Sequence, residues 1–213
     1  MATDLNAQTQ RRDAIVRILR QNAVARQAEL VTLLHREGHD ATQSSVSRDL
    51  RELGATMILA NTYHLHLRPG EDVIEQLGGL HKVMAWDGPI LTDSGGYQVF
   101  SLGHLAKIDA DGVSLKSVVD GSPVRFTPER VIDIERKLGA DVAMAFDHCP
   151  ADPTDRAQVA AAVERTHAWL ARCVKRHEEH GAEETGQALF PIVQGGVFED
   201  LRRRSVESAL EHD

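Results

Sequence analysis

The sequence predicts an α/β protein with parallel strands, preceded by a small all-α segment. Downstream of Gly54, short apolar runs alternate with helical stretches, which is typical of parallel β/α units. Polar residues stand at the carboxyl ends of these runs, at the edge where parallel sheets carry their functional groups. Upstream of Gly54, apolar residues recur only at helical spacing. We therefore expect two domains, over residues 1–54 and 55–213.

Composition indicates a globular chain with an uneven distribution of charge. Hydrophobic residues make up 42% of the 213 residues, and no apolar run is long enough to span a bilayer, so we expect a cytoplasmic protein without membrane contact. Cys149 and Cys173 are too few for a disulfide framework and form no C-x-x-C pair. Residues 1–54 hold 8 basic and 7 acidic residues, so within the total charge of −8 the second segment carries −9 and would need help to bind a polyanion.

Three helices are expected in the first segment. Apolar residues recur three or four positions apart over residues 10–22, again before Gly38, and a third time after Thr42, which suits an N-cap. The residues of these three groups are Ile15, Ile18 and Leu19; Leu30, Leu33 and Leu34; and Val46, Leu50 and Leu53. Gly54 is expected to end the third helix.

The polar face of the third helix carries hydroxyl and guanidinium groups in one stripe. Its members recur at helical spacing and are Ser44, Ser47, Arg48 and Arg51. Two helices joined by a short turn, the second with exposed polar side chains near its N-terminus, fit helix-turn-helix geometry, in which that helix enters the major groove. The alternative is that the stripe is the solvated face of a three-helix packing unit.

Residues 41–50 (A-T-Q-S-S-V-S-R-D-L), with Arg26 to Leu30 before them, resemble the N-terminal winged helix-turn-helix domain of bacterial arginine repressors. This resemblance covers about residues 10–54 and implies operator DNA as a partner of residues 42–51. The residues that would face the DNA are Gln43, Ser44, Ser47 and Arg48. The two wing strands and the arginine-binding, hexamer-forming domain of such repressors have no counterpart in the sequence.

Four short apolar runs are the strand candidates of the second segment, at residues 57–61, 90–92, 142–146 and 189–193. Helices are expected between and after them, over residues 157–178 and 198–210 and after Thr127, which would cap a helix with Pro128 in its first turn. The polar residues at or just past the strand ends are Asn61, Asp93, Ser94, Asp147 and Gln194. Parallel pairing would bring these side chains to one edge of the sheet.

Four motifs in the second segment resemble, in the same order, motifs of tRNA-guanine transglycosylases. They are N-T-Y-H-L-H-L-R-P-G at 61–70, W-D-G-P-I-L-T-D-S-G-G-Y-Q-V-F at 86–100, M-A-F-D at 144–147 and I-V-Q-G-G at 192–196. The resemblance covers about residues 53–213 and implies an incomplete (β/α)8 TIM barrel, with about four of the eight strands. Such a partial barrel would leave strand edges unpaired and one sheet face uncovered.

The resemblance to this family also implies a function. Its members are pentosyltransferases of queuosine biosynthesis, which exchange guanine at the anticodon wobble position of tRNA for a 7-deazaguanine through a covalent bond between an Asp and the ribose. By resemblance, Asp147 would accept the N–H donors of the base, and Asp93 would be the general acid/base. The other base-binding residues would be Ser94, Tyr97, Cys149, Gln194, Gly195 and Gly196.

Structural roles compete with several of these assignments. Asp93 before Ser-Gly-Gly could be a turn or helix cap, Asp147 is open to a similar reading, and Tyr97 could be a core aromatic. His64 and His66 lie two apart, a spacing that on a strand would place both on one face and could suggest a metal, but no third ligand follows, which favours a structural role. Three positions depart from the family pattern: His148 replaces a Glu, Pro191 a small residue and Val118 a His.

The remaining chemistry of the family would lie outside the matching residues. By resemblance, the nucleophilic Asp, the C-x-C-x-x-C…H zinc site, the basic tRNA-binding surface and the homodimer contact belong to the C-terminal half of the enzyme. We therefore expect no cofactor in this chain and no base exchange by this chain alone. Residues 50–54 (L-R-E-L-G) fit both families, which indicates a chimera or fragment joined there. The alternative function is a DNA-binding module with a passive C-terminal part.

Overall fold

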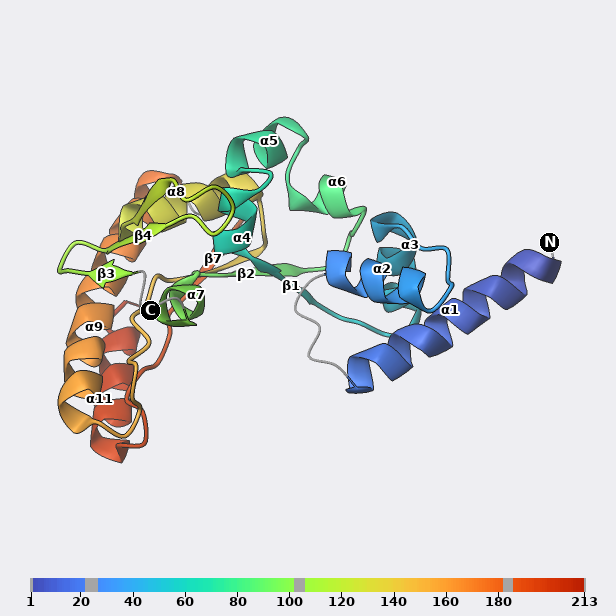
Figure 1. The fold of residues 1–213 in the computed structure, drawn as a ribbon. Coiled ribbons are helices and arrows are strands. Elements are labelled where there is room, and N and C mark those ends of the chain that lie inside the picture. Colours follow the sequence, from blue (N-terminus) through green and yellow to red (C-terminus); the bar gives the residue numbers. More distant parts are fainter. Residues whose placement is uncertain (1, 22–26, 102–105, 182–185, 213) are drawn as a thin grey trace.

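A computed structural model describes residues 2–21, 27–101, 106–181 and 186–212. The chain begins with three helices, α1 (Ala2–Gln21), α2 (Gln27–Arg36) and α3 (Gln43–Glu52). Their apolar faces meet in a small core of their own, formed by Ala14, Ile15, Ile18, Leu30, Leu34, Ala41 and Val46. Figure 1 shows these helices at one end of the molecule, away from α9 (Arg156–Glu179) and α11 (Glu199–Leu210) at the other. The predicted three-helix segment is present.

Local sequence fixes both ends of α3. The Thr42 hydroxyl accepts a hydrogen bond from the Ser45 backbone N–H at 3.1 Å, and the Ser45 hydroxyl accepts one from the Thr42 N–H at 2.8 Å. This reciprocal capping box satisfies two N–H groups that the first helical turn leaves free. Gly54 follows the helix with a φ of +83°, a left-handed conformation that glycine adopts without strain.

Four parallel strands form the central sheet of the second segment. They are β1 (Ile58–Asn61), β2 (Ile90–Asp93), β6 (Val142–Met144) and β7 (Ala188–Phe190), in the order β1-β2-β6-β7. Each neighbouring pair runs parallel, so the predicted parallel β/α organisation is confirmed. Among the described residues this sheet stays open rather than closing into a barrel, with β1 and β7 at its edges.

Helices cover one face of this sheet. Ile90, Thr92 and Ala143 lie on the same face of the sheet and are fully buried, and Ile90 belongs to the core formed with residues of α8 (Pro128–Leu138) and α9. As predicted, Thr127 caps α8 by accepting from the Arg130 N–H, and Pro128 occupies the first turn. On the other face, Leu59 and Phe190 are 58% and 50% exposed, as expected for a sheet face without a cover. The shorter helices are α4 (Thr62–Leu67), α5 (Glu71–Gln76), α6 (Leu80–Met84) and α7 (Gly96–Ser101).

A second, antiparallel sheet was not predicted. It contains β3 (Lys107–Ile108), β4 (Val113–Lys116) and β5 (Pro123–Phe126), in that order. Alternate side chains of β4 and β5 enter the main core, namely Val113, Leu115, Val124 and Phe126. The alternation extends over only four residues in each strand, which is too short a pattern to distinguish from a loop.

His64 and His66 lie in a helix, since residues 62–67 form α4, so the two imidazoles do not share the face of a strand. The Asn61 side chain accepts from the His64 backbone N–H at 3.0 Å and so caps a helix directly after β1. His66 lies with its Nδ1 2.7 Å from Glu71 Oε2. Within the described residues, no group of three or more His, Cys, Asp and Glu side chains could hold a metal ion.

The predicted continuous DNA-facing stripe on α3 is also wrong, because part of it is a packing surface. Ser47 is fully buried, and its hydroxyl donates to the Met84 carbonyl at 2.7 Å. The Arg51 guanidinium lies 5.3 Å from the centroid of the Trp86 ring. A small hydroxyl side chain lets the end of α6 approach the helix closely. Gln43, Ser44 and Arg48 stay exposed, so their contact with DNA stays a prediction.

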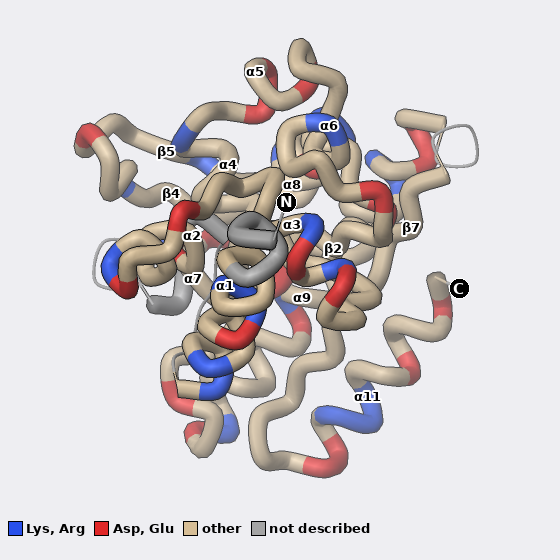
Figure 2. The backbone as a smooth tube through the Cα atoms, turned by 90° about the vertical axis from the view of Figure 1, so that its right-hand side faces the viewer, with Lys and Arg blue, Asp and Glu red and all other residues tan. Residues whose placement is uncertain are grey.

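Charged side chains in the first segment bind mainly one another. Asp49, whose side chain is fully buried, accepts from Arg11 Nε at 2.6 Å and from Arg12 Nε at 3.0 Å, which ties α3 to α1. Arg17 pairs with Glu37 of the segment after α2. Figure 2 shows both basic and acidic positions along the backbone of α1. Arg26, in the repressor-like stretch, lies outside the described residues.

No helix in the part of the chain that the structure describes is both long enough and apolar enough to cross a membrane.

Candidate functional site

Polar side chains gather where the strands of the parallel sheet end. Asn61 and Asp93 are register partners at the ends of β1 and β2. Asp147 lies three residues beyond β6, and Gln194 follows β7. Hydrogen bonds link these residues into two groups, one around the Asp93 carboxyl and one around the Asp147 carboxyl. The sequence-predicted residues Asp93, Ser94, Asp147 and Gln194 are thus brought together.

Asp93 is a half-buried carboxyl held by three donors. Its Oδ2 accepts from Asn61 Nδ2 at 2.6 Å, and its Oδ1 accepts from the backbone N–H groups of Thr62 at 3.1 Å and Gly95 at 3.3 Å. Burial raises the pKa of Asp93 to about 6, against the lowering effect of these hydrogen bonds, and the charge of Asp147 adds to the rise. A carboxyl with this pKa can give up or take a proton near neutral pH.

Asp147 is the centre of the second group and is only 7% exposed. Its Oδ1 accepts from the Ser94 hydroxyl at 2.9 Å, and its Oδ2 accepts from Gln194 Nε2 at 2.7 Å. Burial raises the pKa of Asp147, and the bonds from Ser94 and Gln194 oppose that rise. Each carboxylate oxygen has a second lone pair, so both can accept a further N–H donor from a ligand.

Gly96 makes this arrangement possible, although its position was noted in the sequence only as part of a motif. A Cβ at Gly96 would lie 2.2 Å from Asp147 Oδ1 and 2.9 Å from the Asp147 carbonyl oxygen. Only a residue without a side chain lets the start of α7 approach Asp147 so closely. The backbone N–H of Gly96 also donates to the Ser94 hydroxyl at 3.2 Å.

The other sequence-predicted residues lie around this cluster. Tyr97 is 65% exposed, so the alternative that it is a core aromatic is wrong. Cys149 is half-buried, and burial raises the pKa of its thiol, with the Asp147 charge adding to the effect. A Cβ at Gly195 would lie 2.5 Å from the Arg202 backbone nitrogen, so that glycine lets the strand-end loop pack on α11. A Cβ at Gly196 would likewise lie 2.4 Å from the carbonyl oxygen of the loop residue Pro153.

Two residues of the site were missed from the sequence, Thr62 and Glu135. Thr62 binds Asp93 through its N–H and approaches Glu135 through its hydroxyl. Glu135 is fully buried on the face of α8 that carries Val131 and Leu138. A glutamate at helical spacing within an apolar stripe is the signal that could have found it.

His148, which was expected to replace a Glu of the family pattern, contacts a basic side chain. Its Nδ1 lies 2.8 Å from Arg165 Nη1, and its backbone N–H donates to the Thr166 hydroxyl at 3.0 Å. Burial, together with the Arg165 charge, lowers the pKa of His148 to about 4, so the ring is neutral at neutral pH. The other two departures, Val118 and Pro191, are exposed.

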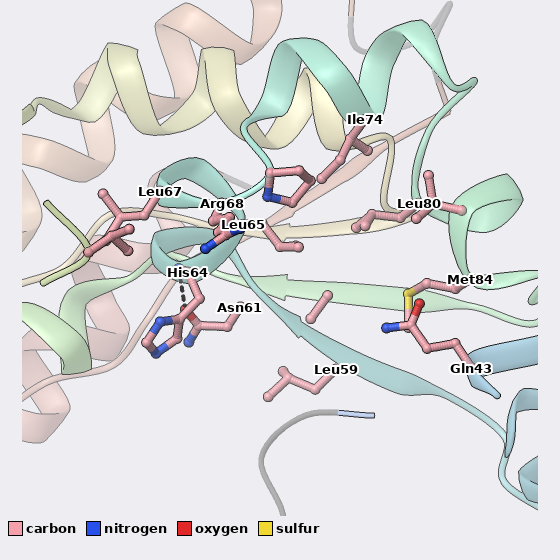
Figure 3. A pocket seen from close by; sticks show the side chains of 14 residues that line it. Gln43, Leu59, Asn61, His64, Leu65, Leu67, Arg68, Ile74, Leu80 and Met84 are labelled. Atoms are coloured by element: carbon pink, nitrogen blue, oxygen red, sulfur yellow. Dashed lines mark hydrogen bonds between the residues drawn. The ribbon is translucent and has the colours of Figure 1, made fainter. Parts of the chain in front are cut away.

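A cavity of about 480 Å³ lies beside the cluster rather than within it. Its lining is mostly apolar, with Gln43, Asn61, His64 and Arg68 as the polar members. Figure 3 shows Asn61 and His64 together on one side and Gln43 with Met84 on the other. Asn61 is therefore shared, since it lines the cavity and also donates to Asp93.

Comparison with known sequences identifies the family. A family model described as queuine tRNA-ribosyltransferase matches residues 35–213. The chain belongs to this family. The resemblance predicted from the four motifs is confirmed, and the match begins within α2, upstream of residue 54. The likeness of residues 10–54 to arginine repressors stays a prediction.

Several curated queuine tRNA-ribosyltransferases are similar to this chain. The protein of Prochlorococcus marinus (strain SARG) is 59% identical over 156 residues, which cover 73% of this chain and 41% of the relative. That of Synechococcus elongatus is 54% identical over 164 residues, covering 77% and 42%. That of Desulforamulus reducens is 51% identical over 177 residues, covering 83% and 46%. The chain thus spans less than half the length of these relatives.

Proposed function

We propose that the cluster around Asp93 and Asp147 binds a guanine-type base in the reaction of a tRNA-guanine transglycosylase. In that reaction guanine at the tRNA wobble position is exchanged for a 7-deazaguanine. The observation that carries the proposal is the Asp147 carboxylate, buried without a cationic partner among the described residues and held by Ser94 and Gln194. Membership of the queuine tRNA-ribosyltransferase family supports it.

Recognition of the base follows from matching donors and acceptors. The edge of guanine presents a ring N–H and an exocyclic amino group side by side, and the two oxygens of Asp147 can accept from both. Such charge-assisted hydrogen bonds are about twice as strong as neutral ones. Ser94 and Gln194 orient the carboxylate, and the Gln194 amide can turn to the base carbonyl. Exposed Tyr97 supplies a ring on which the base stacks.

Asp93 is the proposed general acid/base. The departing guanine takes up a proton at the nitrogen that leaves the ribose, and the incoming base loses one from the same position. One carboxyl that first donates and then accepts a proton serves both steps. The pKa of about 6 that burial gives Asp93 suits this cycling near neutral pH. Cys149, Gly195 and Gly196 complete the proposed lining of the base site.

The nucleophile and the zinc ligands implied by the family resemblance are proposed to lie in the part of the relatives that this chain does not span. The residues described here do not fit a zinc site, since no suitable cluster of ligands occurs among them. We therefore propose that these 213 residues alone bind the base without exchanging it. An assay of labelled guanine release from tRNA tests this, and measurable exchange by the chain alone would overturn it.

Calorimetric titration of guanine and 7-deazaguanine tests base binding. Asp147→Asn keeps the shape of the side chain but loses its charge, and we expect affinity to fall about 30-fold, the equivalent of about 2 kcal/mol. Asp152→Asn, an exposed loop residue, is the matched control and should bind like the wild type. No binding by the wild type, or equal binding by Asp147→Asn, contradicts the proposal.

A further inference from the structure

A carboxylic acid with no proposed part in base recognition lies behind the strand ends. Glu135 projects from α8 beneath the parallel sheet and is 0% exposed. Its Oε1 lies 3.4 Å from the Thr62 hydroxyl, which donates to it. Its Oε2 makes no hydrogen bond with any of the described residues. A buried carboxyl oxygen without a partner is costly, so its retention needs an explanation.

The Glu135 carboxyl lies near the ends of three strands. Thr62 follows β1, Thr92 lies in β2 and Met144 ends β6. The Thr62 hydroxyl donates to Glu135 Oε1, and Thr92 and the Met144 backbone lie close enough to lower the pKa of this carboxyl. Thr62 also donates its backbone N–H to Asp93 Oδ1 at 3.1 Å. One threonine therefore connects Glu135 with Asp93, through two different atoms.

The surroundings of Glu135 favour its uncharged form. Among the described residues, no Lys, Arg or His forms an ion pair with Glu135, whereas Asp93 from β2 and the Cys173 thiol from α9 interact with it. Burial raises the pKa of Glu135 well above its usual value, and the negative charge of Asp93 adds to the rise.

We propose that Glu135, fully buried beneath the sheet, is a positioning residue that fixes the end of β1 and, through Thr62, the hydrogen bonds of Asp93. In its uncharged form it does so without adding a third negative charge behind Asp93 and Asp147. The inference rests on the proposed function only for the acid/base role of Asp93.

Titration of labelled carboxyl carbons by NMR tests the uncharged state. Glu135→Gln is neutral at every pH and has the same shape, so we expect the titration midpoint of Asp93 to change by less than about half a pH unit. If Glu135 were ionised in the wild type, removing its charge would lower the Asp93 midpoint by about one unit or more, which would overturn the proposal. Glu129→Gln, on the same helix but paired with Arg172, is the control and should leave Asp93 unchanged.

The positioning role predicts a different result for Glu135→Leu. This variant removes the acceptor for the Thr62 hydroxyl, so we expect the Asp93 midpoint to move by about one unit. An unchanged midpoint contradicts the positioning role. If this variant does not fold, the backbone amide signals of Thr62 and Met144 in Glu135→Gln decide: both should stay within about 0.2 ppm of the wild type, and larger shifts contradict it. None of these measurements needs a bound base, so the failure of base binding would be seen separately.

Discussion

Two regions of this molecule bury carboxylates in different ways. Asp49 in the helical segment is fully buried and receives two guanidinium groups, from Arg11 and Arg12. Asp93 and Asp147 at the strand ends are also largely buried, but their partners in the described residues are neutral donors only. A buried carboxylate that is paired with arginines, which we call compensated, holds helices together. A buried carboxylate with neutral partners only, which we call uncompensated, lowers the stability of the fold. The contrast teaches where to look for function, since such costs concentrate at sites that bind or react.

The largest expected effect on the free energy of unfolding comes from the compensated carboxylate, Asp49. Asp49→Asn leaves Arg11 and Arg12 without their counter-charge, and we expect the free energy of unfolding to fall by about 3 kcal/mol. Urea denaturation followed by circular dichroism measures it. Glu37→Gln, which removes the exposed partner of Arg17, is the control and should cost less than about 1 kcal/mol. Equal losses of unfolding free energy in the two variants would contradict the distinction between the buried Asp49 and the exposed Glu37.

For the uncompensated Asp93, the expected effect on the free energy of unfolding depends on pH. The pKa of Asp93 is raised from 3.8 to about 6 in the folded protein, so its proton stabilises the fold below about pH 4 and that contribution is lost as the pH rises through 6. Relative to Asp93→Asn, wild-type stability should fall by about 2 kcal/mol between pH 4 and pH 7. Urea midpoints measured at these two pH values check it. If wild-type stability relative to Asp93→Asn rose between pH 4 and pH 7, the raised pKa of Asp93 would be contradicted.

Crowding the carboxylate should affect both stability and binding. In Gly96→Ala the new methyl group would collide with Asp147 Oδ1, and we expect a loss of about 1–2 kcal/mol together with at least about tenfold weaker guanine binding. Thermal unfolding and calorimetry measure the two effects. Wild-type affinity in this variant would show that Asp147 can move without consequence.

The smallest expected effect separates packing from exposure on α3. Ser47→Ala removes the bond to the Met84 carbonyl and should cost about 1 kcal/mol, whereas Ser44→Ala, on the exposed side, should cost less than about 0.5 kcal/mol. The two variants differ only in what surrounds the hydroxyl. Denaturant midpoints that do not distinguish them would mean that α3 and α6 are not packed in solution as described.

Short-range sequence signals predicted much of the fold and several residues of the candidate site. Thr42 and Thr127 act within one helical turn, so their caps were visible in sequence. The four strands could be predicted because each is an apolar run that ends in polar residues, and parallel pairing then joins distant positions such as Asp93 and Asp147.

What could not be predicted depends on contacts between segments or on competing local bonds. Ser47 looked exposed because nothing in the helix itself shows that Met84 packs on it. The pair His64 and His66 would share a face only on a strand, and the Asn61 side chain instead caps a helix there. Glu135 lies at helical spacing within an apolar stripe, which indicates burial, but only the fold shows that it lies behind Asp93.

Guanine affinity, measured by calorimetry for Asp147→Asn and Asp49→Asn side by side, tests the central claim most directly. The temperature must lie well below the unfolding transition of both variants, so that only folded protein is compared. We expect Asp49→Asn to bind guanine within about twofold of the wild type, and Asp147→Asn to bind about 30-fold more weakly. Equal affinities in the two variants would contradict the assignment of Asp147 and its neighbours as a base-binding site.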